Sequence, residues 1–400
     1  MKSIFKITIL ISTVFSLSYS RLTLNLFDKS SKARCLDGSQ YGVYYSSGKE
    51  DGNKNLIISF WGGGLCEGRT HEQFFDNCLD RSKDTLGSSS KWTKTEFDSG
   101  FLSSDKKKNP NFWNWTKFDF PYCDGSFHQG MISEAVEHKG NKLYFRGRQN
   151  VITGLEYVMS KVDLTKIEKV VITGGSTGAY ATFSWINHIK EIFSKINPNI
   201  KFYGIPDSGF FADYYNFKTK DRYYYLTNKI FYEIVNKEQP PLSKECLAEH
   251  PNNGDLCLFP QYFIRYIKVP LLILQSSYDS SNLRDTVGLK CVYYDTLDNC
   301  DEDSKQFAHV FRVYQNDLIK RELDRNSHFS AFLISCVTHC FDGEEMDSDK
   351  WQVPEGSGFT IYKAVEKFIN NPYDSFIKID VMEWPGNSKC ANLNNKRFIS

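Results

Sequence analysis

Residues 174–178 read Gly-Gly-Ser-Thr-Gly, which is the pattern G-x-S-x-G with Ser176 at its centre. An apolar run at residues 170–173 precedes the pattern, and a helix-like stretch follows it. In such a strand–turn–helix the small residues let the turn tighten, so that Oγ of the serine stands exposed at the start of the helix. This arrangement predicts an acyl-transfer nucleophile, with the backbone N–H of Thr177 directed at the oxyanion. The alternative is a glycine-rich loop that contains a serine by chance.

A second glycine-rich turn, residues 62–64, follows the apolar run at residues 56–60. Backbone without side chains can come close to a substrate carbonyl and aim N–H groups at it. We therefore expect Gly63 and Gly64, together with Thr177, to form an oxyanion hole. The alternative is a flexible turn without a role in chemistry.

The acid of a serine hydrolase orients the imidazole that activates the serine. In the α/β class of these enzymes the acid follows the serine, and the histidine comes last. Asp279 lies just beyond the apolar run at residues 270–274 and is one candidate. Asp207 lies just beyond a weaker apolar run at residues 201–205 and is its rival.

Three of the eight histidines, His309, His328 and His339, follow both the serine and a plausible acid. His309 falls within a helical pattern of apolar residues, so we expect a structural role for it. Periodicity alone does not separate His328 from His339, and both remain candidates for the base.

The elements that must position these residues alternate between strands and helices. The four apolar runs named above are expected strands, and residues 149–161 and 179–196 are expected helices. This alternation predicts an α/β fold with a mostly parallel sheet covered by helices on both faces. We expect a surface insertion at residues 82–115 and a cap over the upper edge of the sheet at residues 211–257.

Composition and the N-terminus limit the class of protein. The 400 residues carry 49 Lys and Arg against 48 Asp and Glu, so no electrostatic footprint for nucleic acid exists. The N-terminus has the three parts of a signal peptide: basic residues at Lys2 and Lys6, an apolar run at residues 7–17, and small residues at Ser18 and Ser20. This pattern predicts a signal peptide over residues 1–20. A membrane anchor is the alternative, but the run is too short to span a bilayer. We expect export, with residues 21–400 forming one catalytic domain.

Export accounts for the eleven cysteines, most of which should pair. Two pairings would close short loops: Cys66 with Cys78, and Cys291 with Cys300. Because the number of cysteines is odd, one thiol is left unpaired or pairs between chains. Neither CxxC nor HExxH occurs, so we expect no structural zinc. The sequon that begins at Asn114 predicts a glycosylation site.

Several segments, in order along residues 35–340, resemble the pectin acetylesterase family, which includes the animal Notum carboxylesterases. The segments are Cys35-Leu36-Asp37-Gly38, Gly62-Gly63-Gly64-Leu65-Cys66, Leu86-Gly87-Ser88-Ser89, Tyr122-Cys123-Asp124-Gly125, residues 174–178, Asp207-Ser208-Gly209-Phe210-Phe211, Tyr278-Asp279-Ser280 and Ser335-Cys336-Val337-Thr338-His339-Cys340. The resemblance implies an α/β-hydrolase-like fold with Ser176 as nucleophile, Asp279 as acid and His339 as base. The chain departs from the family where Trp61 stands in place of Glu and Leu65 in place of an aromatic residue.

We therefore expect a secreted serine carboxylesterase that needs no metal or organic cofactor. The resemblance favours acetyl esters of a polysaccharide such as pectin as its substrate. One alternative is a Notum-like enzyme that removes a long fatty acyl group from a protein, and another is an inactive binding protein on the same scaffold. We expect a monomer that binds no nucleic acid and has no stable membrane insertion.

Overall fold

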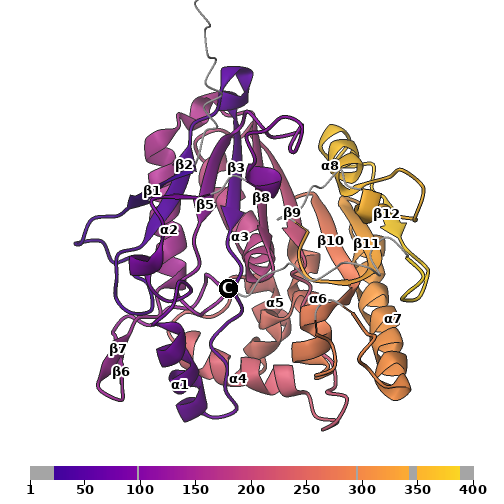
Figure 1. Ribbon diagram of the computed structural model, residues 1–400. Coiled ribbons are helices and arrows are strands. Elements are labelled where there is room, and N and C mark those ends of the chain that lie inside the picture. Colours follow the sequence, from indigo (N-terminus) through magenta and orange to yellow (C-terminus); the bar gives the residue numbers. More distant parts are fainter. Residues whose placement is uncertain (1–21, 97–98, 294–295, 342–348, 388–400) are drawn as a thin grey trace, which may run out of the picture.

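A computed structural model describes residues 22–96, 99–293, 296–341 and 349–387 (Figure 1). The expected signal peptide, residues 1–20, and Cys390 lie outside the described residues. No helix within the described ranges has the length and apolar character needed to cross a membrane.

The centre of the fold is a ten-stranded sheet in which seven neighbouring strands run parallel (Figure 1). In spatial order these are β12 (Ile377–Ile379), β11 (Phe329–Thr338), β10 (Leu271–Asp279), β9 (Lys201–Asp207), β8 (Lys169–Gly175), β3 (Asn55–Phe60) and β5 (Thr116–Phe120). Three antiparallel strands complete one edge: β2 (Gly42–Ser46), β1 (Leu22–Leu26) and β4 (Thr95–Glu96). A separate hairpin joins β6 (Val136–His138) to β7 (Asn141–Leu143). The four expected strands and the mostly parallel sheet are confirmed.

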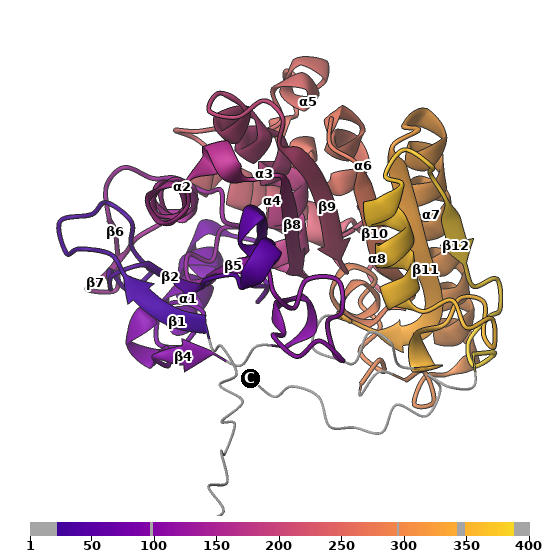
Figure 2. The same ribbon diagram turned by 90° about the horizontal axis from the view of Figure 1, so that it is seen from above.

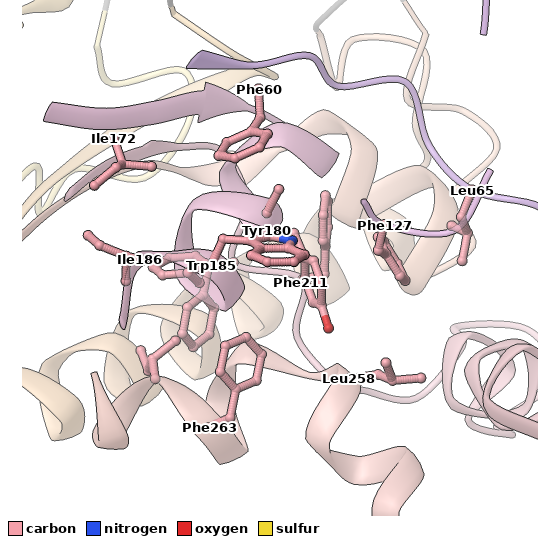
Figure 3. Close-up of a cluster of buried hydrophobic side chains, with 14 of the residues drawn as sticks. Phe60, Leu65, Phe127, Ile172, Tyr180, Trp185, Ile186, Phe211, Leu258 and Phe263 are labelled. Carbon is pink, nitrogen blue, oxygen red and sulfur yellow. The ribbon is translucent and has the colours of Figure 1, made fainter. Parts of the chain in front are cut away.

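Side chains alternate between the two faces of the parallel strands, so both faces carry apolar residues. In β3, Leu56 and Ile58 belong to one hydrophobic cluster, whereas Ile57 belongs to another. The first face is covered by α2 (Gly147–Lys161), α3 (Thr177–Ser194) and α7 (Glu302–Arg325), as Figure 2 shows. Figure 3 shows Phe60 and Ile172 of the sheet beside Tyr180, Trp185 and Ile186 of α3. Both expected helices are thereby confirmed: α2 begins two residues earlier than expected, and α3 begins and ends two residues earlier.

The second face is covered in two parts, which corrects one expectation. α8 (Ile361–Asn370) contacts β10 and β11, and its Phe368 ring lies against Tyr203 of β9, with the ring centroids 6.0 Å apart. Phe101, Phe112 and Trp115 bury their rings beside Ile57 and Val171. The segment at residues 82–115 is therefore part of the core and not only a surface insertion, because the middle of this face needs an apolar cover.

Further helices are α1 (His71–Arg81), α4 (Tyr223–Val235), α5 (Lys244–Glu249) and α6 (Pro260–Phe263). Four disulfides link pairs of described cysteines: Cys35–Cys123, Cys66–Cys78, Cys246–Cys257 and Cys291–Cys300. The two expected pairings, Cys66 with Cys78 and Cys291 with Cys300, are confirmed. Cys336 is also disulfide-bonded. Asn114 lies partly buried in the turn before β5, and its glycosylation stays a prediction.

Candidate active site

Ser176 occupies the tight turn between the end of β8 and the start of α3. Its backbone has φ 56° and ψ −123°, a region that residues with a side chain rarely adopt. The surroundings hold this strained turn, because the Ser176 N–H donates to the Asp207 carbonyl at 2.9 Å and its carbonyl accepts from the Tyr180 N–H at 3.1 Å. This is the geometry in which a hydroxyl is presented at the head of a helix.

Two glycines allow the backbone segments of the site to approach one another. A Cβ atom on Gly178 would lie 1.9 Å from the Phe60 carbonyl oxygen, and one on Gly62 would lie 2.5 Å from the Gly175 carbonyl oxygen. Since any side chain would force these segments apart, glycine is required at both positions. The glycine-rich loop at residues 62–64 consequently lies directly against the turn that carries Ser176.

Asp279 and His339 meet at the carboxyl ends of the neighbouring strands β10 and β11. Oδ2 of the fully buried Asp279 lies 2.8 Å from Nδ1 of His339. The same carboxylate accepts hydrogen bonds from the Asn282 backbone N–H at 2.9 Å and from Nε2 of Gln275 at 3.1 Å. The carboxylate is therefore held by three donors and is aligned with one nitrogen of the imidazole.

The charges around His339 determine its protonation. Burial lowers the pKa of the imidazole, but the negative charge of Asp279 and the hydrogen bond to it act in the opposite direction. Asp207 and Asp285 add to this effect, so that the pKa of His339 is raised above its usual value. An imidazole in this environment is a stronger base than a free one.

The remaining acid and base candidates are engaged elsewhere. The carboxylate of Asp207 accepts hydrogen bonds from the Ser208 hydroxyl at 2.9 Å and from the Phe341 N–H at 2.7 Å. Nε2 of His328 lies 3.0 Å from the Ile267 carbonyl oxygen, at the opposite end of β11 from His339. Nδ1 of His309 lies 2.6 Å from the Tyr278 hydroxyl on the inner side of α7. Of these histidines, only His339 lines the cavity that contains Ser176.

That cavity has a volume of about 830 Å³ and opens above Ser176 and His339. The glycines at 62–64 and Thr177 line it as well, and within the described ranges the N–H groups of Gly63, Gly64 and Thr177 have no protein acceptor. Aromatic side chains form much of its wall: Tyr44, Trp61, Trp92, Phe101, Phe211 and Tyr224. Phe211 and Tyr224 come from the expected cap at residues 211–257. Donors without partners beside a serine suit the binding of a developing oxyanion.

The two departures from the family pattern have different environments. Trp61 lines the cavity, where its indole N–H donates to the carboxylate of Asp119 and its ring stacks on Tyr44 with centroids 5.7 Å apart. Leu65 also lines the cavity, although most of its side chain is buried in the larger hydrophobic cluster. Both replacements therefore change the cavity wall, and the replacement at position 65 also adds to the core.

Sequence reasoning missed two residues that contact the glycine-rich loop. His128 is buried, and its Nε2 lies 2.9 Å from the Trp61 carbonyl oxygen. Burial lowers the pKa of His128, so the ring is neutral and donates this hydrogen bond. Arg81, at the end of α1, donates to two carbonyls of the loop. Both residues precede Ser176, so a search for a base after the serine passes over them.

Comparisons with known proteins identify the family from the sequence and support the fold from the structure. A family model described as Pectinacetylesterase matches residues 16–391. Pectin acetylesterase 5 of Arabidopsis thaliana is 26% identical, over 94% of this chain and 85% of that protein. Pectin acetylesterase 11 of the same organism is 29% identical, over 90% and 88% of the two chains.

A second group of relatives consists of protein deacylases. Palmitoleoyl-protein carboxylesterase NOTUM of Schmidtea mediterranea is 25% identical, over 68% of this chain and 51% of that protein. The structure of the Wnt deacylase Notum from Drosophila superimposes with a TM-score of 0.77 at 20% identity, covering 93% of this chain and 99% of that one. The likeness confirms the expected α/β-hydrolase-like fold. The chain therefore belongs to the pectinacetylesterase family and is a carboxylic ester hydrolase.

Proposed function

We propose that the protein hydrolyses esters through a Ser176–His339–Asp279 triad. The observation that carries this proposal is the 2.8 Å contact between Asp279 and Nδ1 of His339, beside the cavity that His339 shares with Ser176. Because Nδ1 is engaged by the carboxylate, Nε2 is the nitrogen left to accept the Ser176 proton. Asp279 fixes this tautomer and stabilises the imidazolium that forms.

The reaction then follows two steps. Oγ of Ser176 bonds to the ester carbonyl carbon while its proton moves to His339, and the N–H groups of Gly63, Gly64 and Thr177 hold the oxyanion. The bond to the leaving alkoxide breaks, and His339 returns the proton to that oxygen. Water then bonds to the acyl carbon while its proton moves to His339. The bond from that carbon to Oγ of Ser176 breaks, His339 returns the proton to Oγ, and the carboxylic acid is released.

We infer that the acyl group is short, such as acetyl. Glu67 and Asp285 line the cavity with Phe211 and Tyr224. Burial raises the pKa of Glu67, and the nearby charge of Asp285 raises it further. Asp285 is hydrogen-bonded to Ser281 and Arg284, whereas within the described residues no side chain or backbone group hydrogen-bonds the Glu67 carboxyl. A long apolar chain against this wall would remove water from the Glu67 carboxyl without replacing it, which is unfavourable. The pectin acetylesterases that the chain matches over most of their length support acetyl esters of a polysaccharide as the substrate.

We further propose that residues 1–20 are removed during export and that the remaining single domain works outside the cell as a monomer. The disulfides fit an oxidising compartment. N-terminal sequencing of the exported protein should begin near Arg21, and size-exclusion chromatography with light scattering should give the mass of one chain.

Activity against esters of increasing acyl length tests the proposed substrate. We expect the highest kcat/KM for p-nitrophenyl esters with about two to four acyl carbons, and release of acetate from acetylated pectin. The Ser176→Ala variant is the matched control and should release none. A maximum at about eight carbons or more would instead support a fatty-acyl deacylase, as the Notum relatives are named.

A further inference from the structure

The carbonyl groups of the glycine-rich loop are held from behind by side chains. The Gly63 and Leu65 carbonyls accept hydrogen bonds from Nη1 and Nη2 of Arg81, at 2.7 and 3.2 Å. The Gly64 carbonyl accepts from the Thr177 hydroxyl at 2.9 Å. One guanidinium thus spans two peptide groups on either side of Gly64, which a planar fork of donors can do with little loss of freedom.

The direction of these carbonyls fixes the direction of the N–H groups. The Gly63 carbonyl and the Gly64 N–H belong to one trans peptide, in which they point to opposite sides of the chain. Arg81 is not among the residues that line the cavity, whereas Gly63 and Gly64 are. With the carbonyl directed at Arg81 on the far side, the Gly64 N–H is directed at the cavity.

Arg81 forms no direct ion pair with a carboxylate of the described residues, although its charge acts on the more distant Glu67 and Asp124. Within the described residues, no Asp or Glu oxygen lies within 4.0 Å of its guanidinium. A cationic donor on a carbonyl polarises the whole peptide group, so the N–H of the same peptide becomes a stronger donor. Its effect therefore falls on the Gly64 N–H, one of the proposed oxyanion donors.

We propose that Arg81 is a positioning residue that aims and polarises the Gly64 N–H for the oxyanion formed at Ser176. The inference rests on the proposed function, because it assumes an oxyanion at Ser176. Arg81 itself touches no substrate. The Cys66–Cys78 disulfide fastens the same loop to α1, and Cys78 lies one helical turn before Arg81.

The Arg81→Ala variant tests this inference. Because the oxyanion forms only in the transition state, we expect kcat for p-nitrophenyl acetate to fall roughly 10- to 100-fold while KM changes less than about threefold. The acid limb of the pH profile should stay where it is, since His339 is untouched. Arg81→Lys should restore only part of kcat, because an ammonium lacks the fork that spans two carbonyls. Methylguanidinium at millimolar concentration should raise kcat of Arg81→Ala and leave that of the wild type unchanged.

Arg34→Ala is the matched control. Nη1 of Arg34 also donates to a backbone carbonyl, at 2.7 Å from the Ala33 oxygen, and Arg34 does not line the cavity. This variant should keep wild-type kcat. Thermal unfolding of both variants shows whether each is folded. A folded Arg81→Ala enzyme with kcat within about threefold of wild type, or with its loss confined to KM, would overturn the inference. An active Ser176→Ala enzyme would overturn the proposed function instead, so the two failures are distinguishable.

Discussion

Asp207 joins the turn of Ser176 to the segment that follows His339. Its backbone carbonyl accepts from the Ser176 N–H at 2.9 Å, and its carboxylate accepts from the Phe341 N–H at 2.7 Å. The rival acid of the sequence analysis thus lies between the two halves of the site. Asp279, and not Asp207, contacts Nδ1 of His339. We therefore expect substitutions of the two aspartates to have different effects on activity.

Asp279→Asn should lower kcat by roughly 10²–10⁴-fold, because an amide favours the wrong tautomer of His339. The loss should appear in steady-state hydrolysis of p-nitrophenyl acetate, with thermal unfolding as a check of folding. Asp207→Asn keeps an oxygen to accept the Phe341 N–H and should lose far less activity. An unaffected Asp279→Asn enzyme beside an inactive Asp207→Asn enzyme would transfer the role of the acid to Asp207.

His339→Ala should reduce kcat about as much as loss of the serine, because triad members act as a unit. His328→Ala is the control: its ring contacts the Ile267 carbonyl at the other end of β11, so its removal should affect stability more than activity. Both variants are compared in the same ester assay. An inactive His328→Ala enzyme beside an active His339→Ala enzyme would show that the base has been assigned wrongly.

Activity should depend on pH through the protonation of His339. Only the neutral imidazole accepts the Ser176 proton, so activity falls as the pH drops through the pKa of His339. Because the carboxylates of Asp279, Asp207 and Asp285 outweigh burial and raise this pKa, the midpoint should lie above that of a free imidazole, about 6.5. The profile of kcat/KM against pH measures it. Constant activity down to about pH 4 would rule out a histidine base.

The strands and turns around Ser176 could be predicted because their signals are local. A continuous apolar run that ends in Gly-Gly-Ser-Thr-Gly indicates a buried strand, a tight turn and a helix, and the structure has all three. The strand β11 was missed because Ser330, Ser335 and Thr338 interrupt its apolar character. Recognition of this strand would have separated His328 from His339, since only His339 follows the carboxyl end, where Ser176 and Asp279 also lie.

The support behind the glycine-rich loop could not be predicted. Arg81 and His128 approach residues 61–65 from α1 and from the loop after Cys123, and no sequence spacing encodes these long-range contacts. The buried role of residues 82–115 was missed for a similar reason. The exposure of their aromatic rings depends on how much of the second face α8 covers. The position of α8 on the sheet is a property of the folded chain and not of the local sequence.

The disulfides should contribute unequally to stability. Cys35–Cys123 closes a loop of 88 residues and Cys291–Cys300 one of 9, so the first removes more entropy from the unfolded chain. Replacing the first pair with alanines should cost about 2 kcal/mol more free energy of unfolding than replacing the second. Denaturant unfolding of the two double variants measures this difference. Equal losses would contradict the chain-entropy explanation.

The central claim is that Ser176 is an activated nucleophile, and labelling with a fluorophosphonate probe tests it most directly. The probe bonds to a serine only when a neighbouring base removes its proton. We predict one label per chain, located on Ser176 by peptide mass spectrometry, and no label on Ser176→Ala, which should also lose ester hydrolysis. A label on another residue, or a Ser176→Ala enzyme that keeps activity within about tenfold of wild type, would contradict the claim.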